Sequence, residues 1–252
     1  NYLLKMSLKL ARNLSRYYSI NFSLPKRTKN KITHIILHYT GMKKESEAIK
    51  KLCSHKSNVS SHYFIKKNGQ LLNLVPDLYT AWHAGKSNWK KLSSLNKCSI
   101  GIEISNPGHD YGYKNFSLNQ INSLIKLLRY LSKKYNIRKQ NILGHSDIAP
   151  NRKKDPGEKF PWKKLADKNL CHWHYLSEHE TRKKRYLKVD NHEEKKFLNN
   201  LYKIGYSKKD NTKLKHNKTN LIIAFQRKYR QSLINGKIDQ ECLLISKNLI
   251  KL

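Results

Sequence analysis

Four residues in three short segments carry the side chains that a hydrolytic metal site needs. His38 lies in ILHYTG, Glu103 in SIGIEIS, and His145 and Asp155 in GHSDIAPNRKKDPG. Two imidazole nitrogens and one carboxylate oxygen can hold a tetrahedral Zn²⁺ and leave one position for water, and a further carboxylate can take that water's proton. His38, His145 and Asp155 are therefore the predicted metal ligands. Glu103 is the predicted proton shuttle.

Lys153 could add a positive charge to this site. It lies two positions before Asp155, so its ammonium can approach the metal and offset the charge of a tetrahedral intermediate. It also belongs to the run Arg152-Lys153-Lys154, in which any of the three side chains could simply be solvated. The sequence leaves both interpretations open.

Two other residues compete for the metal. His34 lies four positions before His38 in a predicted strand, so both imidazoles point to the same face, but His34 lies deeper in the strand. Asp147 competes with Asp155, or it could orient the ring of His145 as a hydrogen-bond acceptor.

Three predicted strands position the candidate ligands. ITHIILHYT is rich in β-branched residues and predicts a buried strand that ends near Gly41, with His38 close to its C-terminal end. CSIGIEIS alternates, which sets Glu103 on the face opposite its isoleucines. NILGH is a short strand that brings His145 to the loop carrying Asp155.

The remaining patterns predict helices around this sheet. Residues 45–53 form a short helix, a capping box at Ser117–Gln120 opens a helix that runs to Tyr135, and PWKKLA opens another short helix. Asn68-Gly69 between two apolar runs predicts a β-hairpin. We therefore expect an α/β fold with a mixed central sheet flanked by helices.

The sequence divides into four predicted regions. A basic N-terminal extension covers 1–24, its opening stretch spaced like a surface helix, and the catalytic domain covers 25–172. Residues 173–187 are the predicted linker, because the sequence from about Leu176 to Leu187 is polar and has no apolar period. Three segments with helical apolar spacing make 188–252 a small three-helix domain.

The composition excludes some classes of protein. The 252 residues hold 52 Lys and Arg against 17 Asp and Glu, a net charge of +35, but these are spread along the chain without a nucleic-acid-binding pattern, so nucleic acid is a disfavoured partner. No stretch approaches ~20 apolar residues, which argues against a membrane span. The four cysteines lack a CxxC pair, which disfavours a thiolate zinc site and leaves their redox state open. We expect a monomer.

Several motifs together resemble a known family. ILHYTG, VSSHYFI, AWHAG, SIGIEISNPG, GHSDIAP and RKKDPGEKFPW, in this order, resemble the zinc-dependent N-acetylmuramoyl-L-alanine amidases of the type-2 family, related to phage amidase lysozymes and peptidoglycan recognition proteins. The similarity covers about residues 20 to 170. It implies one Zn²⁺ per chain and hydrolysis of the amide between the lactyl group of N-acetylmuramic acid and L-alanine, in peptidoglycan or in muropeptides. The alternative is a non-catalytic muropeptide-binding protein of the same fold.

The resemblance also implies roles for individual residues. The family's metal ligands match His38, His145 and Asp155, its catalytic carboxylate matches Glu103, and its transition-state lysine matches Lys153. The residues that match motifs lining the family's substrate groove are His62, Trp82, His83 and Asn106. For His62 and Trp82, packing beneath the site is the alternative.

The C-terminal region resembles a second known module. IIAFQRKYR and NGKIDQECL are similar to the small peptidoglycan-binding-like domain that follows this catalytic domain in two-domain members. Such a module would raise the local concentration of wall polymer at the groove, or it could be merely structural. It favours the periplasm or cell envelope as the place of action, with the cytoplasm as the alternative.

Overall fold

A five-stranded mixed sheet forms the centre of the protein. The computed structural model describes residues 17–208 and 217–251. The strands lie in the order β4-β3-β8-β2-β9, and all neighbours are parallel except the hairpin pair β3 and β4. Their bounds are β2 His34–Tyr39, β3 Tyr63–Ile65, β4 Leu71–Asn73, β8 Ser99–Ile104 and β9 Ile142–Gly144. The predicted α/β class, the hairpin at Asn68-Gly69 and the three strands near the ligands are confirmed.

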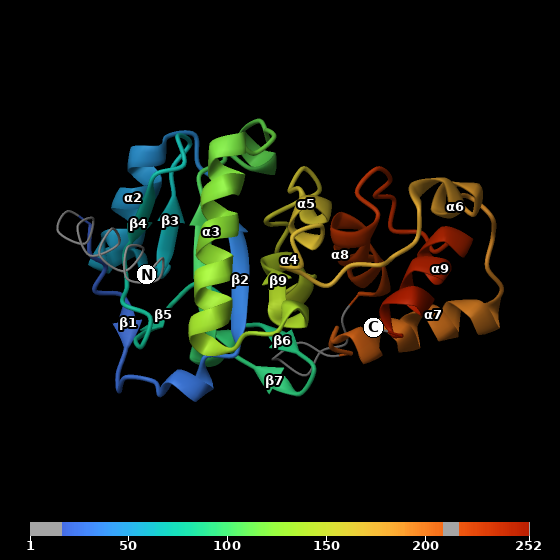
Figure 1. Ribbon diagram of the computed structural model, residues 1–252, viewed down its shortest axis with the longest axis horizontal. Coiled ribbons are helices and arrows are strands. Elements are labelled where there is room, and N and C mark those ends of the chain that lie inside the picture. Colours follow the sequence, from blue (N-terminus) through green and yellow to red (C-terminus); the bar gives the residue numbers. More distant parts are fainter. Residues whose placement is uncertain (1–16, 209–216, 252) are drawn as a thin grey trace.

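Helix α3 (Leu118–Tyr135) covers one face of this sheet (Figure 1). The predicted capping box is present, since Ser117 Oγ accepts the N–H of Gln120 and the Gln120 side chain accepts the N–H of Ser117. The apolar stripe of the helix packs on the side chains that alternate strands direct to this face. This core contains Ile35, Leu37, Ile100, Ile102, Ile104, Leu124, Leu127, Leu128 and Leu131.

The opposite face carries two separate apolar clusters. At one, helix α2 (Glu45–Cys53) packs Ile49 and Leu52 on Phe64 of β3. At the other, Ile36 of β2 and Leu143 of β9 meet the C-terminal helices. Period two in the strands places His38 and Glu103 on this second face as well. The candidate site therefore occupies the face that no single helix covers.

The C-terminal helices share a core with the sheet. Helices α7 (Asn191–Ile204), α8 (Lys218–Tyr229) and α9 (Gln240–Leu249) match the three predicted segments and gather beyond β9 (Figure 1). Phe197, Leu201 and Phe225 belong to the same buried cluster as Ile36 and Leu143. The domain bounds 25–172 and 188–252 remain a prediction, but the two regions pack against each other through a continuous apolar core.

The segment predicted as a linker contains ordered structure. Helix α6 (Glu178–Lys183) begins with a capping box formed by Ser177 and Glu180. After it, the guanidinium of Arg185 donates two hydrogen bonds, of 2.7 and 2.8 Å, to the buried carboxylate of Glu241. Helix α6 is short and charged, so it has too few apolar residues to show a helical period in the sequence. Its contacts with α9 could not be predicted from the local pattern.

The smaller elements complete the fold. The two-stranded pairs are β1 (Phe22–Ser23) with β5 (Thr80–Ala81) and β6 (Asn88–Trp89) with β7 (Leu92–Ser93), and the short helices are α4 (His145–Ile148) and α5 (Trp162–Ala166). The helix expected at the start of the chain falls mostly on residues 1–16, which lie outside the described ranges. Within those ranges, no helix is both long and apolar enough to cross a membrane.

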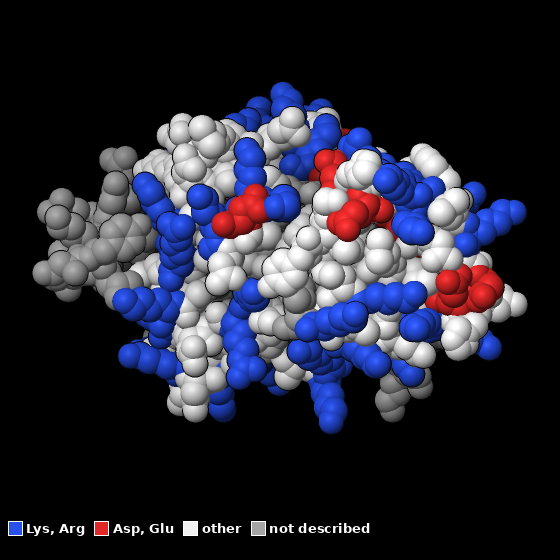
Figure 2. Space-filling model, turned by 45° about the vertical axis from the view of Figure 1, so that its right-hand side comes forward, with Lys and Arg blue, Asp and Glu red and all other residues white. Residues whose placement is uncertain are grey.

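Basic side chains are spread over the face of the molecule that Figure 2 draws. Figure 2 shows Lys and Arg scattered over the visible face, with Asp and Glu in a few small groups. All four cysteines are free thiols, so no disulfide contributes to stability. The stability of the fold therefore depends on the apolar clusters and on buried polar contacts.

Asp77 makes one of these contacts, between the segment after β4 and the end of α3. Its carboxylate accepts hydrogen bonds from the hydroxyls of Tyr63 and Tyr135, both at 2.6 Å, and from Lys134 Nζ at 2.7 Å. Burial alone would raise the pKa of Asp77, but the Lys134 charge and the three hydrogen bonds lower it below its ordinary 3.8.

We expect Asp77→Asn to reduce the free energy of unfolding at pH 7 by about 2 kcal/mol, the size of hydrogen bonds to a charged acceptor. Because the pKa is lower in the folded state, this contribution is present above pH 3.8 and is lost as the pH falls through the folded pKa. Urea titrations of both proteins at several pH values measure it. Asp167→Asn, which removes an exposed pair with Lys163, is the control with an expected change near zero. Equal stability of the D77N variant and the parent at pH 7 would contradict the assignment.

Candidate metal centre and active site

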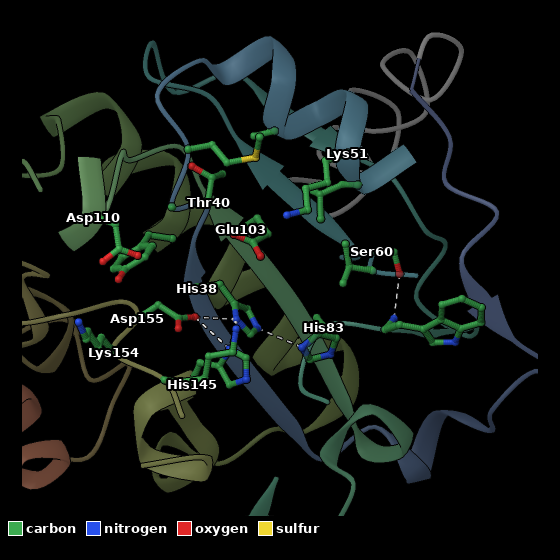
Figure 3. A pocket seen from close by; sticks show the side chains of 18 of the residues that line it. His38, Thr40, Lys51, Ser60, His83, Glu103, Asp110, His145, Lys154 and Asp155 are labelled. Atoms are coloured by element: carbon green, nitrogen blue, oxygen red, sulfur yellow. Dashed lines mark hydrogen bonds and ion pairs between the residues drawn. The ribbon is translucent and has the colours of Figure 1, made fainter. Parts of the chain in front are cut away.

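Three side chains converge at the carboxyl ends of β2 and β9. His38 is near the end of β2, His145 follows β9 directly, and Asp155 comes from the loop after α4. His38 Nδ1 lies 2.9 Å from His145 Nδ1, and both nitrogens lie 3.0 Å from Asp155 Oδ2 (Figure 3). All three side chains are buried. The structure thus brings together the three residues that the sequence predicts as metal ligands.

The outer nitrogen of His145 fixes which tautomer of its ring is present. His145 Nε2 lies 3.0 Å from the carbonyl oxygen of Ala84. A carbonyl oxygen only accepts, so Nε2 carries the proton and donates it. The lone pair of Nδ1 is therefore directed at His38 and Asp155.

A chain of hydrogen bonds fixes the tautomer of His38 in the same way. Ser99 Oγ donates its single proton to the carbonyl of Leu95 at 2.6 Å, so it accepts from His83 Nε2 at 3.2 Å. His83 Nδ1 is then the acceptor for His38 Nε2–H at 3.1 Å. This leaves the Nδ1 lone pair of His38 pointing into the triad.

Three acceptor atoms thus lie within 3.0 Å of one another with no proton among them. Burial and the neighbouring His145 lower the pKa of His38 to about 4, which keeps its ring neutral. A tetrahedral Zn²⁺ with ligands at ~2.0–2.1 Å holds them roughly 3.3 Å apart, close to these separations. The donor set and its spacing therefore fit a divalent cation.

Glu103 lies beside the triad on the neighbouring strand. The parallel pairing of β2 and β8 sets Glu103 opposite His38, and its carboxylate points into the cavity (Figure 3). Its Oε2 is buried and has no hydrogen-bond partner among the described residues. Burial and the nearby charge of Asp155 raise the pKa of Glu103 well above its ordinary value. A raised pKa makes the carboxylate a stronger proton acceptor.

The cavity above these residues has a volume of about 360 Å³. Lys51 of α2 and Asp155 lie on different sides of it (Figure 3). Lys51, Arg152, Lys153 and Lys154 line it together with the triad and Glu103, whereas Asp110 adds one negative charge. The cavity is thus lined mainly by basic and hydrogen-bonding groups, with a carboxylate and the triad on its floor.

Comparison with known proteins decides the family. Residues 28–158 match the Amidase_2 family model, described as N-acetylmuramoyl-L-alanine amidase. The chain is 32% identical over 236 residues to the N-acetylmuramoyl-L-alanine amidase AmiD of Escherichia coli, which covers 88% of this chain and 83% of AmiD. The chain belongs to the Amidase_2 family. It is an N-acetylmuramoyl-L-alanine amidase.

Solved structures agree over nearly the whole chain. The complex of E. coli AmiD with anhydro-N-acetylmuramic acid-L-Ala-D-gamma-Glu-L-Lys has a TM-score of 0.75 and 30% identity, and the match covers 91% of this amidase and 92% of that chain. AmpDh3 from Pseudomonas aeruginosa also has a TM-score of 0.75, with 27% identity and coverage of 94% and 96%. Similarity at this coverage includes the C-terminal helices of the amidase.

The four residues predicted to line the substrate groove lie in different places. Trp82 and His83 line the cavity, and the indole N–H of Trp82 donates to Ser23 Oγ at 2.8 Å. Both ring nitrogens of His83 are engaged, one by His38 and the other by Ser99. Gly101 leaves room for this ring, since a Cβ there would lie 2.3 Å from His83 Cγ.

His62 and Asn106 lie outside the lining of the cavity. His62 is fully buried; its Nδ1 accepts the N–H of Gly101, and its Nε2 donates to the carbonyl of Tyr79. Asn106 donates to the carbonyl of Lys114 and accepts the N–H of Gly108. Both side chains thus bind backbone groups around the site, and their place in the substrate groove remains a prediction.

The two competing ligands are not part of the triad. His34 Nδ1 is 2.7 Å from the hydroxyl of Thr33, and His34 does not belong to the metal-ligating group. Asp147 does not replace Asp155, and its carboxylate makes no hydrogen bond to the ring of His145, because it accepts from Gly144 N–H, Tyr206 and Lys228. The possible role of Asp147 as a direct acceptor for His145 is therefore wrong.

Sequence reasoning missed Lys51 and the function of Ser99. Lys51 lies in a helix that shows ordinary amphipathic spacing, and its charge opposes the rise in the pKa of Glu103. The sequence pattern places Ser99 only at the start of a predicted strand. Its contact with His83 depends on a pairing between segments that no local pattern of this amidase reveals.

We expect Ser99→Ala to weaken Zn²⁺ binding about tenfold or more, because His83 loses the acceptor that fixes its tautomer and hence that of His38. Competition with a chelating dye measures the affinity. Ser61→Ala is a matched control, since Ser61 is also buried but donates to the carbonyl of Tyr63. Equal Zn²⁺ affinity of the S99A and S61A variants would contradict the relay.

Proposed function

We propose that this amidase holds a Zn²⁺ ion with His38, His145 and Asp155 and hydrolyses the amide between the lactyl group of N-acetylmuramic acid and L-alanine in muropeptides. The observation that carries this proposal is that three unprotonated metal-binding atoms, two imidazole nitrogens and one carboxylate oxygen, lie within 3.0 Å of one another. When bound there, Zn²⁺ supplies Lewis acidity that polarises an amide carbonyl and acidifies water.

Glu103 is the proposed general base and acid. Its carboxylate faces the cavity beside the triad, and Oε2 is free to take the proton of the attacking water as the new C–O bond forms. The same proton then passes to the L-alanine nitrogen as the C–N bond breaks. One carboxyl group thus serves both transfers, and the net reaction consumes one water.

Lys153 is the proposed electrostatic stabiliser. It lines the cavity, is partly buried, and follows α4 on the loop that ends at Asp155. Its ammonium can offset the negative charge that develops on the carbonyl oxygen during attack. Lys154 is adjacent and also lines the cavity, but it is more exposed than Lys153.

The muropeptide substrate is supported by the cavity and by the relatives. The AmiD and AmpDh3 structures include complexes with anhydro-N-acetylmuramic acid-L-Ala-D-gamma-Glu-L-Lys and with an anhydromuramic pentapeptide, respectively. These ligands carry carboxylates, which suit the basic cavity lining of this amidase. Trp82 offers an apolar face to the sugar or the peptide.

Incubation of the Zn²⁺-loaded protein with purified sacculi and, separately, with anhydro-muropeptides tests the reaction, with products identified by mass spectrometry. We expect free peptides that begin with L-alanine. Glu103→Gln should lower kcat by roughly 10²–10⁴-fold because proton transfer is lost, while Zn²⁺ binding persists. Muropeptide binding without any cleavage by the parent protein would contradict the proposal and support the non-catalytic alternative.

Lys153→Ala should lower kcat by roughly 10²–10³-fold with little change in KM, since the charge acts on the transition state. Lys168→Ala, which changes an exposed lysine outside the cavity lining, is the control and should retain the parent rate. Steady-state kinetics on one anhydro-muropeptide measure both variants. An unchanged kcat in the K153A variant would remove Lys153 from the mechanism.

We infer that the amidase acts in the periplasm or cell envelope. The wall that contains the scissile bond is there, and similarity to AmiD extends through the C-terminal helices. Immunodetection after cell fractionation tests this placement, and recovery only with the cytoplasmic fraction would contradict it.

A further inference from the structure

Asp147 connects the metal centre to the C-terminal helices. It belongs to the four-residue helix α4, which begins with the ligand His145. Its Oδ2 accepts the N–H of Gly144 at 2.8 Å and thereby caps this helix. The remaining bonds of the carboxylate come from distant parts of the chain, since Oδ1 accepts from Tyr206 Oη at 2.8 Å and Oδ2 from Lys228 Nζ at 3.1 Å.

Lys228 is an unusual donor because its side chain is only 2% exposed. Besides Asp147, its ammonium donates to the carbonyl of Ile142 in β9 at 3.3 Å and lies 4.5 Å from the ring centroid of Trp162. A buried ion pair of this kind adds little net stability compared with apolar side chains of similar size. Its contacts instead hold Ile142 at the start of β9 and Asp147 in α4, on either side of His145.

The segment that carries Asp155 is fixed from the same helix. Gln231, two residues after the end of α8, donates through Nε2 to the carbonyls of Glu158 and Phe160 at 2.5 and 2.6 Å. The two ligand segments also touch directly, since Ser146 N–H donates to the carbonyl of Asp155 at 2.9 Å. A Cβ on Gly144 would lie 2.7 Å from Pro156 Cδ, so only glycine permits this approach.

We propose that α8 and the residues around it are a positioning element of the metal centre, with Lys228 and Tyr206 acting through Asp147 on His145, and Gln231 acting on the segment after Asp155. The C-terminal helices are then part of the catalytic apparatus rather than only a tether to the wall. Their apolar faces are buried against the sheet, which holds Lys228 and Tyr206 at fixed places. This inference rests on the proposed metal site.

Lys228→Met in the full chain tests it, because methionine fills the space but leaves Asp147 without its cation. We expect the Zn²⁺ dissociation constant to rise about tenfold or more, as for other residues that orient metal ligands. The visible spectrum of the Co²⁺-substituted protein should also change, since it reports ligand geometry. Lys237→Met, an exposed lysine near the same helices, is the control and should bind both ions like the parent.

Tyr206→Phe provides a second variant if the K228M protein fails to fold. It removes one hydroxyl that donates to Asp147, so Zn²⁺ binding should weaken about threefold, the equivalent of one ordinary hydrogen bond. Circular dichroism of each metal-free variant checks the fold independently of metal binding.

The outcomes separate this inference from the proposed function. A parent protein that binds no stoichiometric Zn²⁺ would contradict the proposed function and the inference with it. Normal binding by the parent, together with parent-like Zn²⁺ affinity and Co²⁺ spectra in folded Y206F or K228M protein, would overturn only the role assigned to α8.

Discussion

Three hydrogen-bond acceptors held together without a proton between them are the constraint on which the rest of the site depends. His38 Nδ1, His145 Nδ1 and Asp155 Oδ2 repel one another unless a cation lies among them. The two Nδ1 atoms stay unprotonated because the Nε2 atom of each ring carries the proton and donates it to another group. Ala84 accepts from one ring, and the His83–Ser99 pair determines the tautomer of the other. The affinity for metal is thus built into hydrogen bonds that do not themselves touch the ion.

The sheet explains why these groups meet where they do. Every second residue of β2 and β8 faces α3, and these residues form a continuous apolar core. His38 and Glu103 alternate with them and therefore lie on the opposite face. There, α2 and the C-terminal helices cover separate parts of the sheet, so the ligands lie in a cavity between two packed regions. The same C-terminal helices fix the turn at Asp147, which couples distant packing to the metal centre.

Local patterns in the sequence predicted the strands, the longer helices and the ligands, because each depends on short-range periodicity or on motif resemblance. The alternation in β8 gave the face of Glu103, but not its register opposite His38, which depends on pairing between strands. The sequence also did not predict that the apolar faces of the C-terminal helices pack against β2 and β9. Contacts between buried polar residues were the least predictable from the sequence. Asp147 and Lys228 are 81 positions apart, and the residues that flank each of them in the sequence give no sign of their contact.

The account is tested most directly by anomalous diffraction at the zinc absorption edge from crystals of the Zn²⁺-loaded protein. It predicts one ion per chain, bound through Nδ1 of His38, Nδ1 of His145 and a carboxylate oxygen of Asp155, with both Nε2 atoms still donating to Ala84 and His83. An ion bound through either Nε2 atom, an ion at another site, or crystals that take up no zinc would contradict it.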